Sequence, residues 1–145
     1  MKEIINVISG IRNIKSLSDA EKFAKTYEDL FVKWISKLPK DKNARKKIMQ
    51  IAAKFALKNM EELGEDPKGL DINRVTAEDA IKFLAKTPKI GKAIAEYLTP
   101  EDLYYFYATL FGKSVDLSKE ENVKRVSQLA LDVHQKLRRE FLDMG

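Results

Sequence analysis

Apolar side chains recur every three to four positions along almost the whole chain, which is the spacing that lines one face of an α-helix. No stretch alternates apolar and polar residues between turn signals, so we expect no strand. The chain is therefore predicted to be all-α, a compact bundle of about seven helices. Six of them are expected over 3–15, 18–38, 41–63, 76–85, 100–112 and 118–141. The seventh is a short helix that follows a turn at Thr87 and Pro88, buries Ile90, Ala93, Ile94 and Tyr97, and stops before Thr99.

Capping residues mark the expected helix starts. A serine or threonine followed three residues later by an acidic residue can satisfy two backbone amides that the first helical turn leaves without partners. The pairs that fit are Ser18 with Glu21, Thr76 with Asp79, and Ser118 with Glu121, and Thr99 is expected to cap a further helix. Asp41 is expected to cap the third helix. The start at Thr99 is the clearest, because Pro100 follows at a position that prolines favour.

Two long helices have apolar faces that we expect to be buried. In the third helix this face is predicted to comprise Ala44, Ile48, Ile51, Ala52, Phe55 and Leu63. In the last helix it is predicted to comprise Val126, Leu129, Ala130, Val133, Leu137 and Phe141. Both sets follow the spacing of a helix that packs one side against a core.

The chain is predicted to be a single helical domain over 1–145, with faintly similar halves, 1–64 and 76–145, joined by a linker over 65–75. Residues 28–31 resemble 101–104, and residues 47–52 resemble 125–130. One interpretation is a pseudo-twofold duplication of a helical unit of about 75 residues. The other is chance likeness between amphipathic helices.

Composition excludes several kinds of protein. The chain has no cysteine, so disulfides, thiolate zinc sites and cysteine nucleophiles are excluded and a cytoplasmic location is expected. No apolar run approaches the ~20 residues that span a bilayer, so no membrane partner is expected. Abundant lysine, glutamate and isoleucine resemble the composition of hyperthermophile proteins.

Candidate catalytic chemistry is sparse. His134 is the only histidine, and it lacks the glycine-flanked serine that a hydrolase elbow would supply. Adjacent carboxylates on a helix point about 100° apart and do not converge. No phosphate-binding loop or metal-spaced motif is present. We therefore predict no catalytic residue, no metal and no cofactor, and an enzyme is only a third hypothesis.

The net charge of +5 is concentrated in one segment. Its basic residues are Lys37, Lys40, Lys42, Arg45, Lys46 and Lys47, opposed by Asp41 alone. Such a segment either contacts the phosphates of a nucleic acid or forms a solvated surface. Cations at the start of a helix interact unfavourably with the helix dipole, so the presence of these basic residues there needs a separate explanation.

Residues 83–98, FLAKTPKIGKAIAEYL, resemble a helix-hairpin-helix DNA-binding motif. The hairpin of that family reads Gly-apolar-Gly, and Lys89 stands here where the first glycine would be. The resemblance implies that backbone amides near Gly91, with Lys89 and Lys92, contact a DNA phosphate at a helix N-terminus. Because the first glycine is replaced, the close approach of the backbone is in doubt.

Tyr104, Tyr105, Phe106 and Tyr107 form an aromatic run that covers every face of its helix. At least one ring should remain near the surface, and Tyr104, Tyr105 and Tyr107 are predicted interface residues. The alternative is that a tyrosine stacks on a nucleic-acid base.

The leading hypothesis from the sequence is a noncatalytic helical protein-interaction or structural module. Its expected partner is another protein or a second copy of the chain. The alternative is a nucleic-acid-binding protein that uses the basic segment 37–47 and the hairpin-like segment 83–98.

Overall fold

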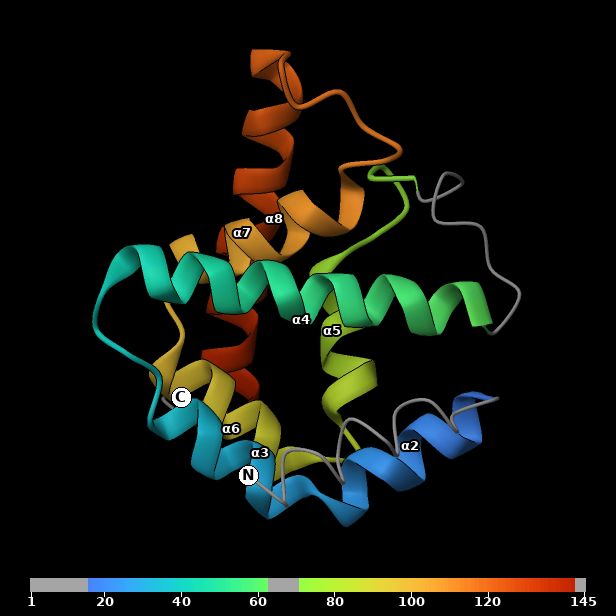
Figure 1. Ribbon diagram of the computed structural model, residues 1–145, viewed down its shortest axis with the longest axis vertical. Helices are drawn as coiled ribbons and strands as arrows, with labels where there is room; N and C mark the ends of the chain where they lie inside the picture. The colour runs from blue at the N-terminus through green and yellow to red at the C-terminus, as the bar shows by residue number, and fades with distance from the viewer. Residues whose placement is uncertain (1–15, 63–70, 143–145) are drawn as a thin grey trace.

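The computed structural model describes residues 16–62 and 71–142, and this part of the chain is all-α, as predicted. The described residues form seven helices and no strand (Figure 1). The helices are α2 (Leu17–Thr26), α3 (Glu28–Ser36), α4 (Lys42–Glu62), α5 (Ala77–Leu84), α6 (Pro88–Tyr97), α7 (Pro100–Phe111) and α8 (Glu120–Phe141). The helix predicted over 3–15 and most of the predicted linker lie outside the described residues.

Helix α7 is the centre of the packing. It packs against α4 on one side and against α8 on another, while α6 packs against both α3 and α8. In Figure 1, α4 crosses the front of the molecule, α8 runs along its long axis, and α3 and α6 lie together below α4. The two longest helices are thus linked mainly through α7.

The prediction of one helix over 18–38 is wrong, because the chain bends at Tyr27 and continues as α3. The hydroxyl of Thr26 donates to the carbonyl oxygen of Lys22 at 2.8 Å, a bond that often bends helices. The predicted cap is also displaced. Ser16 rather than Ser18 accepts from the backbone amide of Asp19, at 3.1 Å.

Of the other predicted caps, three are confirmed and one is wrong. The Asp102 amide donates to the Thr99 hydroxyl at 3.2 Å, so the cap at Thr99 is confirmed. The Thr99 amide donates to Asp102 at 2.9 Å in return, which completes a capping box. The Thr76 cap and the Asp41 cap are confirmed as well. The cap at Ser118 is wrong, because its hydroxyl donates to Asp116 at 2.6 Å instead and α8 begins at Glu120.

The predicted buried face of α4 is wrong. Ile48 and Ile51 are exposed, and the described side chains that α4 buries are those of Met49, Ala53 and Leu57. At 3.6 residues per turn, Ile51 lies about 160° around the helix from Met49. Position 63 and the side chain of residue 55 lie outside the described part.

The core is centred on α7 and α8. The predicted face of α8 is confirmed, since Val126, Leu129, Ala130, Val133 and Leu137 are buried and Phe141 packs against them. Phe111, at the end of α7, is fully buried. The proposed duplication is unconfirmed. It would make α3 and α4 the counterparts of α7 and α8, which pack against each other, but α3 packs mainly against α6 and α4 packs mainly against α7.

Candidate functional site

The most unusual surface of the described residues is an apolar face on α4. Ile48, Ile51 and Ala52 are neighbours at helical spacing, and all three are exposed. The two isoleucines are 37% and 53% exposed and belong to the few large apolar residues on the described surface. Single exposed apolar residues are ordinary, whereas large contiguous apolar patches are typical of surfaces that bind a partner. We call these three residues the α4 apolar face.

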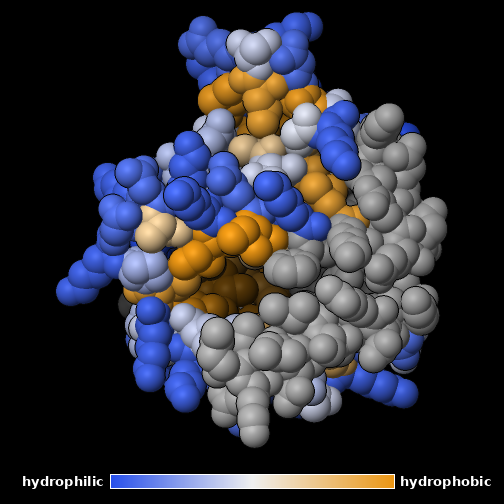
Figure 2. Space-filling model, in the orientation of Figure 1, coloured by the Kyte–Doolittle hydropathy of each residue, from blue (hydrophilic) through white to orange (hydrophobic). Residues whose placement is uncertain are grey.

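This face borders a hollow. Figure 2 shows apolar side chains gathered along the lower edge of α4, beneath its hydrophilic residues, with further apolar atoms lining the recess below them. Helix α4 therefore carries apolar residues on two sides. One side is buried against α7, and the other is exposed.

Arg45 fixes which side of α4 faces α7. Its Nη2 lies 2.6 Å from Asp102 Oδ2 and its Nε lies 3.1 Å from Oδ1, so the pair is bidentate. Nη2 also donates to the carbonyl oxygen of Tyr97 at 2.9 Å. Arg45, Met49, Ala53 and Leu57 follow one another at intervals of four and so form one row along the helix. The ion pair therefore turns the α4 apolar face away from α7.

The Asp102 carboxylate is held in its charged form. Burial by itself raises the pKa of this carboxyl, but the hydrogen bonds from Arg45 and Thr99 and the charge of Arg45 outweigh burial, so the pKa is lowered. The side chains of Asp102 and Arg45 are only 7% and 18% exposed. Arg45, a predicted phosphate contact, is thus engaged within the chain.

The other residues of the basic segment lie on the surface. Lys37, Lys40, Lys42, Lys46 and Lys47 are exposed. Lys46 has a close aromatic neighbour, since its Nζ lies 5.0 Å from the centre of the Tyr105 ring. They occupy the loop between α3 and α4 and the first turns of α4.

The hairpin-like segment is occupied by other parts of the chain. The backbone amide of Lys89 donates to Glu28 Oε2 at 3.1 Å, and the Lys89 ammonium lies 3.3 Å from Asp29. Gly91 is buried, and a Cβ placed on it would lie 2.8 Å from the Phe141 ring. Lys92 alone of the three predicted contacts is exposed without an ion pair to a described residue. The position at which the resemblance would place a DNA phosphate against the backbone is therefore occupied by Glu28 and Phe141 of the chain itself.

The two sets of predicted phosphate contacts lie at opposite ends of α6. Lys89 is in the first turn of α6, where it contacts the start of α3. Arg45 contacts Tyr97, the last residue of α6. Eight residues at 1.5 Å per residue place these ends about 12 Å apart. The structure does not bring the two sets together at one point.

The predicted interface tyrosines are partly buried within their own chain. Tyr104 and Tyr105 form an edge-on ring pair 5.6 Å apart, and Tyr107 stacks near Phe111 with ring centres 6.4 Å apart. Burial, with a smaller effect of Asp79, raises the pKa of Tyr107 to about 12. All three rings pack against the core cluster.

Within the described part of the chain, no hydroxyl or carboxylate is bonded to the His134 imidazole. Its Nε2 lies 3.1 Å from the carbonyl oxygen of Leu98, an atom that only accepts, so Nε2 carries the proton. Burial lowers the pKa of the imidazole, the bond to Leu98 opposes this effect, and Arg138 adds to it. The histidine therefore ties α8 to the end of α6.

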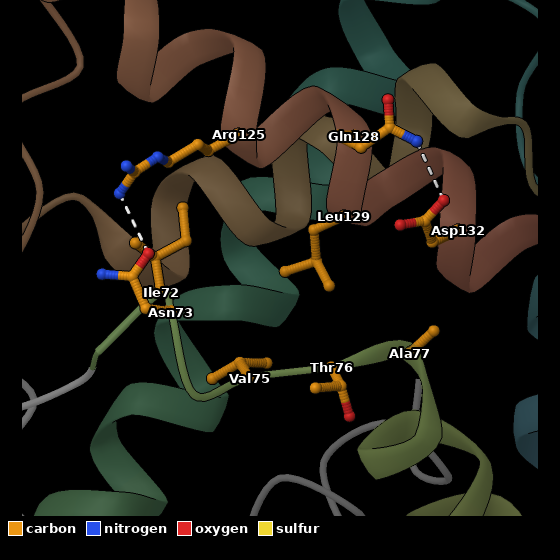
Figure 3. A pocket seen from close by; sticks show the side chains of 9 residues that line it. All are labelled: Ile72, Asn73, Val75, Thr76, Ala77, Arg125, Gln128, Leu129 and Asp132. Carbon is orange, nitrogen blue, oxygen red and sulfur yellow. Dashed lines mark hydrogen bonds between the residues drawn. The ribbon is translucent and has the colours of Figure 1, made fainter.

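An open cleft of about 370 Å³ lies between residues 72–77 and α8 (Figure 3). Four of its polar side chains are bonded in two pairs. Arg125 Nη1 donates to Asn73 Oδ1 at 2.9 Å, and Gln128 Nε2 donates to Asp132 Oδ1 at 2.9 Å. Leu129 points across the cleft toward Val75. The hydroxyl of Thr76, which also lines the cleft, donates to Asp79 Oδ2 at 3.4 Å within the cap of α5.

Two further searches of the described residues give negative results. Within 16–62 and 71–142, no three side chains of the metal-binding types gather closely enough to hold an ion. Over the same ranges, no helix combines the length and the apolar character that crossing a bilayer requires.

Comparisons with known proteins leave the function to be argued from the chain itself. No family model matches the sequence, no curated protein matches it, and no solved structure matches it.

Proposed function

We propose that this chain is a noncatalytic helical interaction module that binds a helix of a partner protein through the α4 apolar face. The observation that carries the proposal is the exposure of Ile48 and Ile51, at 37% and 53%, side by side on one helix. Full burial of a fully exposed isoleucine contributes about 1.5–3 kcal/mol, and covering the exposed part of each of these isoleucines gains a corresponding fraction of that value. Two adjacent ones bordering a hollow therefore offer a substantial gain to a partner.

The support of α4 fits this role. The helix is 21 residues long, and its opposite side is fixed by the buried row of Met49, Ala53 and Leu57 and by the Arg45–Asp102 ion pair. A rigid helix with apolar residues one turn apart presents a ridge that can pack into the groove between side chains on an amphipathic partner helix. Helix α4 would therefore lose little conformational freedom when a partner binds.

The experiment uses a fluorescently labelled helical peptide with leucines on one face and glutamine elsewhere. We expect it to bind the native chain in a fluorescence anisotropy titration. We expect Ile48→Gln with Ile51→Gln to weaken binding at least about tenfold, since each 1.4 kcal/mol is a factor of ten. The unfolding midpoint in urea should change little, because exposed positions alter stability by no more than about 0.5 kcal/mol.

A matched control is available on another helix. Leu131 of α8 is 43% exposed, and Leu131→Gln should leave peptide binding unchanged. Absence of binding by the native chain would contradict the proposal. Equal weakening by Leu131→Gln and by the double variant would contradict it as well, because the peptide would then be sensing apolar surface in general.

The alternative proposal is a nucleic-acid-binding protein, and one observation supports it. Lys37, Lys40 and Lys42 are exposed on or next to the loop between α3 and α4 and form no ion pair with another described residue. It is the weaker proposal, because Arg45 and Lys89 contact carboxylates of their own chain. A gel shift of duplex DNA at ~50 mM salt tests it, since phosphate contacts are strongest at low salt.

A further inference from the structure

Lysines flank the α4 apolar face. Lys47 lies four residues before Ile51 and Lys54 lies three residues after it, so both are surface neighbours of Ile51. Both lysines are exposed, and neither forms an ion pair with another described residue. Any helix that covers Ile51 would place its own flanking residues next to these two ammonium groups.

Helix α4 is basic over most of its length. From Lys42 to Met60 its sequence holds six basic residues and no acidic residue. The six are Lys42, Arg45, Lys46, Lys47, Lys54 and Lys58. Like charges brought together at an interface are unfavourable, and opposite charges steer and select a partner. The charge of α4 therefore disfavours pairing with α4 of a second copy.

We infer that the partner segment is an acidic amphipathic helix, with apolar residues that cover Ile48 and Ile51 and carboxylates that face Lys47 and Lys54. This inference rests on the proposed function and adds the chemistry of the partner. The apolar residues supply most of the affinity, and the carboxylates supply selectivity and register. The hollow beside α4 favours a ridge of side chains over a flat lipid surface, and isoleucines contribute nothing to phosphate binding.

The test compares three labelled peptides that share one leucine face. Their flanking positions carry glutamate, glutamine or lysine. We expect the native chain to bind the glutamate peptide about tenfold more tightly than the glutamine peptide, and the lysine peptide most weakly. The preference should shrink as salt is raised, because exposed charges are screened.

Charge reversal gives the decisive comparison. Lys47→Glu with Lys54→Glu should invert the order, so that the lysine peptide binds best. The control, Lys82→Glu with Lys92→Glu, changes two exposed lysines on α5 and α6 by the same net charge. It should keep the glutamate peptide first, and circular dichroism should show both variants folded.

Each other outcome overturns a specific statement. Equal binding of the three peptides by the native chain and by the charge-reversed variant would overturn the inference and leave the proposed function in place. Failure of every peptide to bind would overturn the proposed function. Two further results would reject an acidic helix: binding to anionic lipid vesicles or duplex DNA in preference to the glutamate peptide, or a dimer in sedimentation that Ile51→Gln dissolves.

Discussion

Asp102→Ala is expected to lower the free energy of unfolding by about 3 kcal/mol, one of the two largest effects that we expect from a single substitution. The variant leaves the guanidinium of Arg45, whose side chain is 18% exposed, without its carboxylate. It also removes the side chain that accepts from the Thr99 amide at the start of α7. Breaking a buried ion pair from one side is costly because the remaining charge stays desolvated.

The measurement is urea denaturation followed by circular dichroism. Asp29→Ala is the matched control, because Asp29 also pairs with a cation but its side chain is 87% exposed. An exposed pair contributes at most about 1 kcal/mol, so the control should resemble the native chain. If the two variants lost the same free energy of unfolding, the ion pair would not be holding α4 in place.

The contribution of Asp102 to the free energy of unfolding depends on pH with a definite sign. The pKa of Asp102 is lowered in the folded chain, so its contribution to the free energy of unfolding is complete above the unfolded pKa of about 3.9. The contribution is lost as the pH falls below that value. The difference between the native chain and Asp102→Asn should therefore shrink in acid and stay constant near neutrality.

Phe111→Ala is expected to cost about 3–5 kcal/mol, as is usual for removing a large buried side chain. Phe111 is fully buried at the end of α7 and stacks near Tyr107. Truncation leaves a cavity where α7 supports its neighbours, and thermal and urea denaturation should both report the loss. Leu131→Ala, on the exposed side of α8, should stay within about 0.5 kcal/mol. Similar costs for the two variants would show that the core does not centre on α7.

Local features of the fold were predictable from the sequence. The cap at Thr99 depends on residues within one turn, and the buried face of α8 has a single apolar row, so neither needs knowledge of the rest of the chain. The predicted cap at Ser118 was wrong because Asp116, two residues away, accepts a hydrogen bond from the serine hydroxyl. Such competition between nearby acceptors is hard to judge from spacing alone.

The candidate site was not predictable, because it depends on partners far apart in sequence. Helix α4 has two apolar rows, and the choice between them is made by Asp102, which is 57 positions from Arg45. Gly91 and Lys89 likewise meet Phe141 and Glu28 only through the fold. One signal was present: Met49, Ala53 and Leu57 follow Arg45 at intervals of four, and this row could have been weighed against the isoleucines.

The central claim, an uncovered apolar face on α4, has a direct test, because the chain contains no cysteine. Ile51→Cys and Ala53→Cys each introduce one thiol, at positions that are 53% and 0% exposed. We expect the thiol at 51 to react with a maleimide at nearly the rate measured in urea, and the thiol at 53 to react at least about a hundredfold more slowly, since it requires opening of the fold. Equal protection of both thiols would contradict the claim, because the face would then be covered in the native chain.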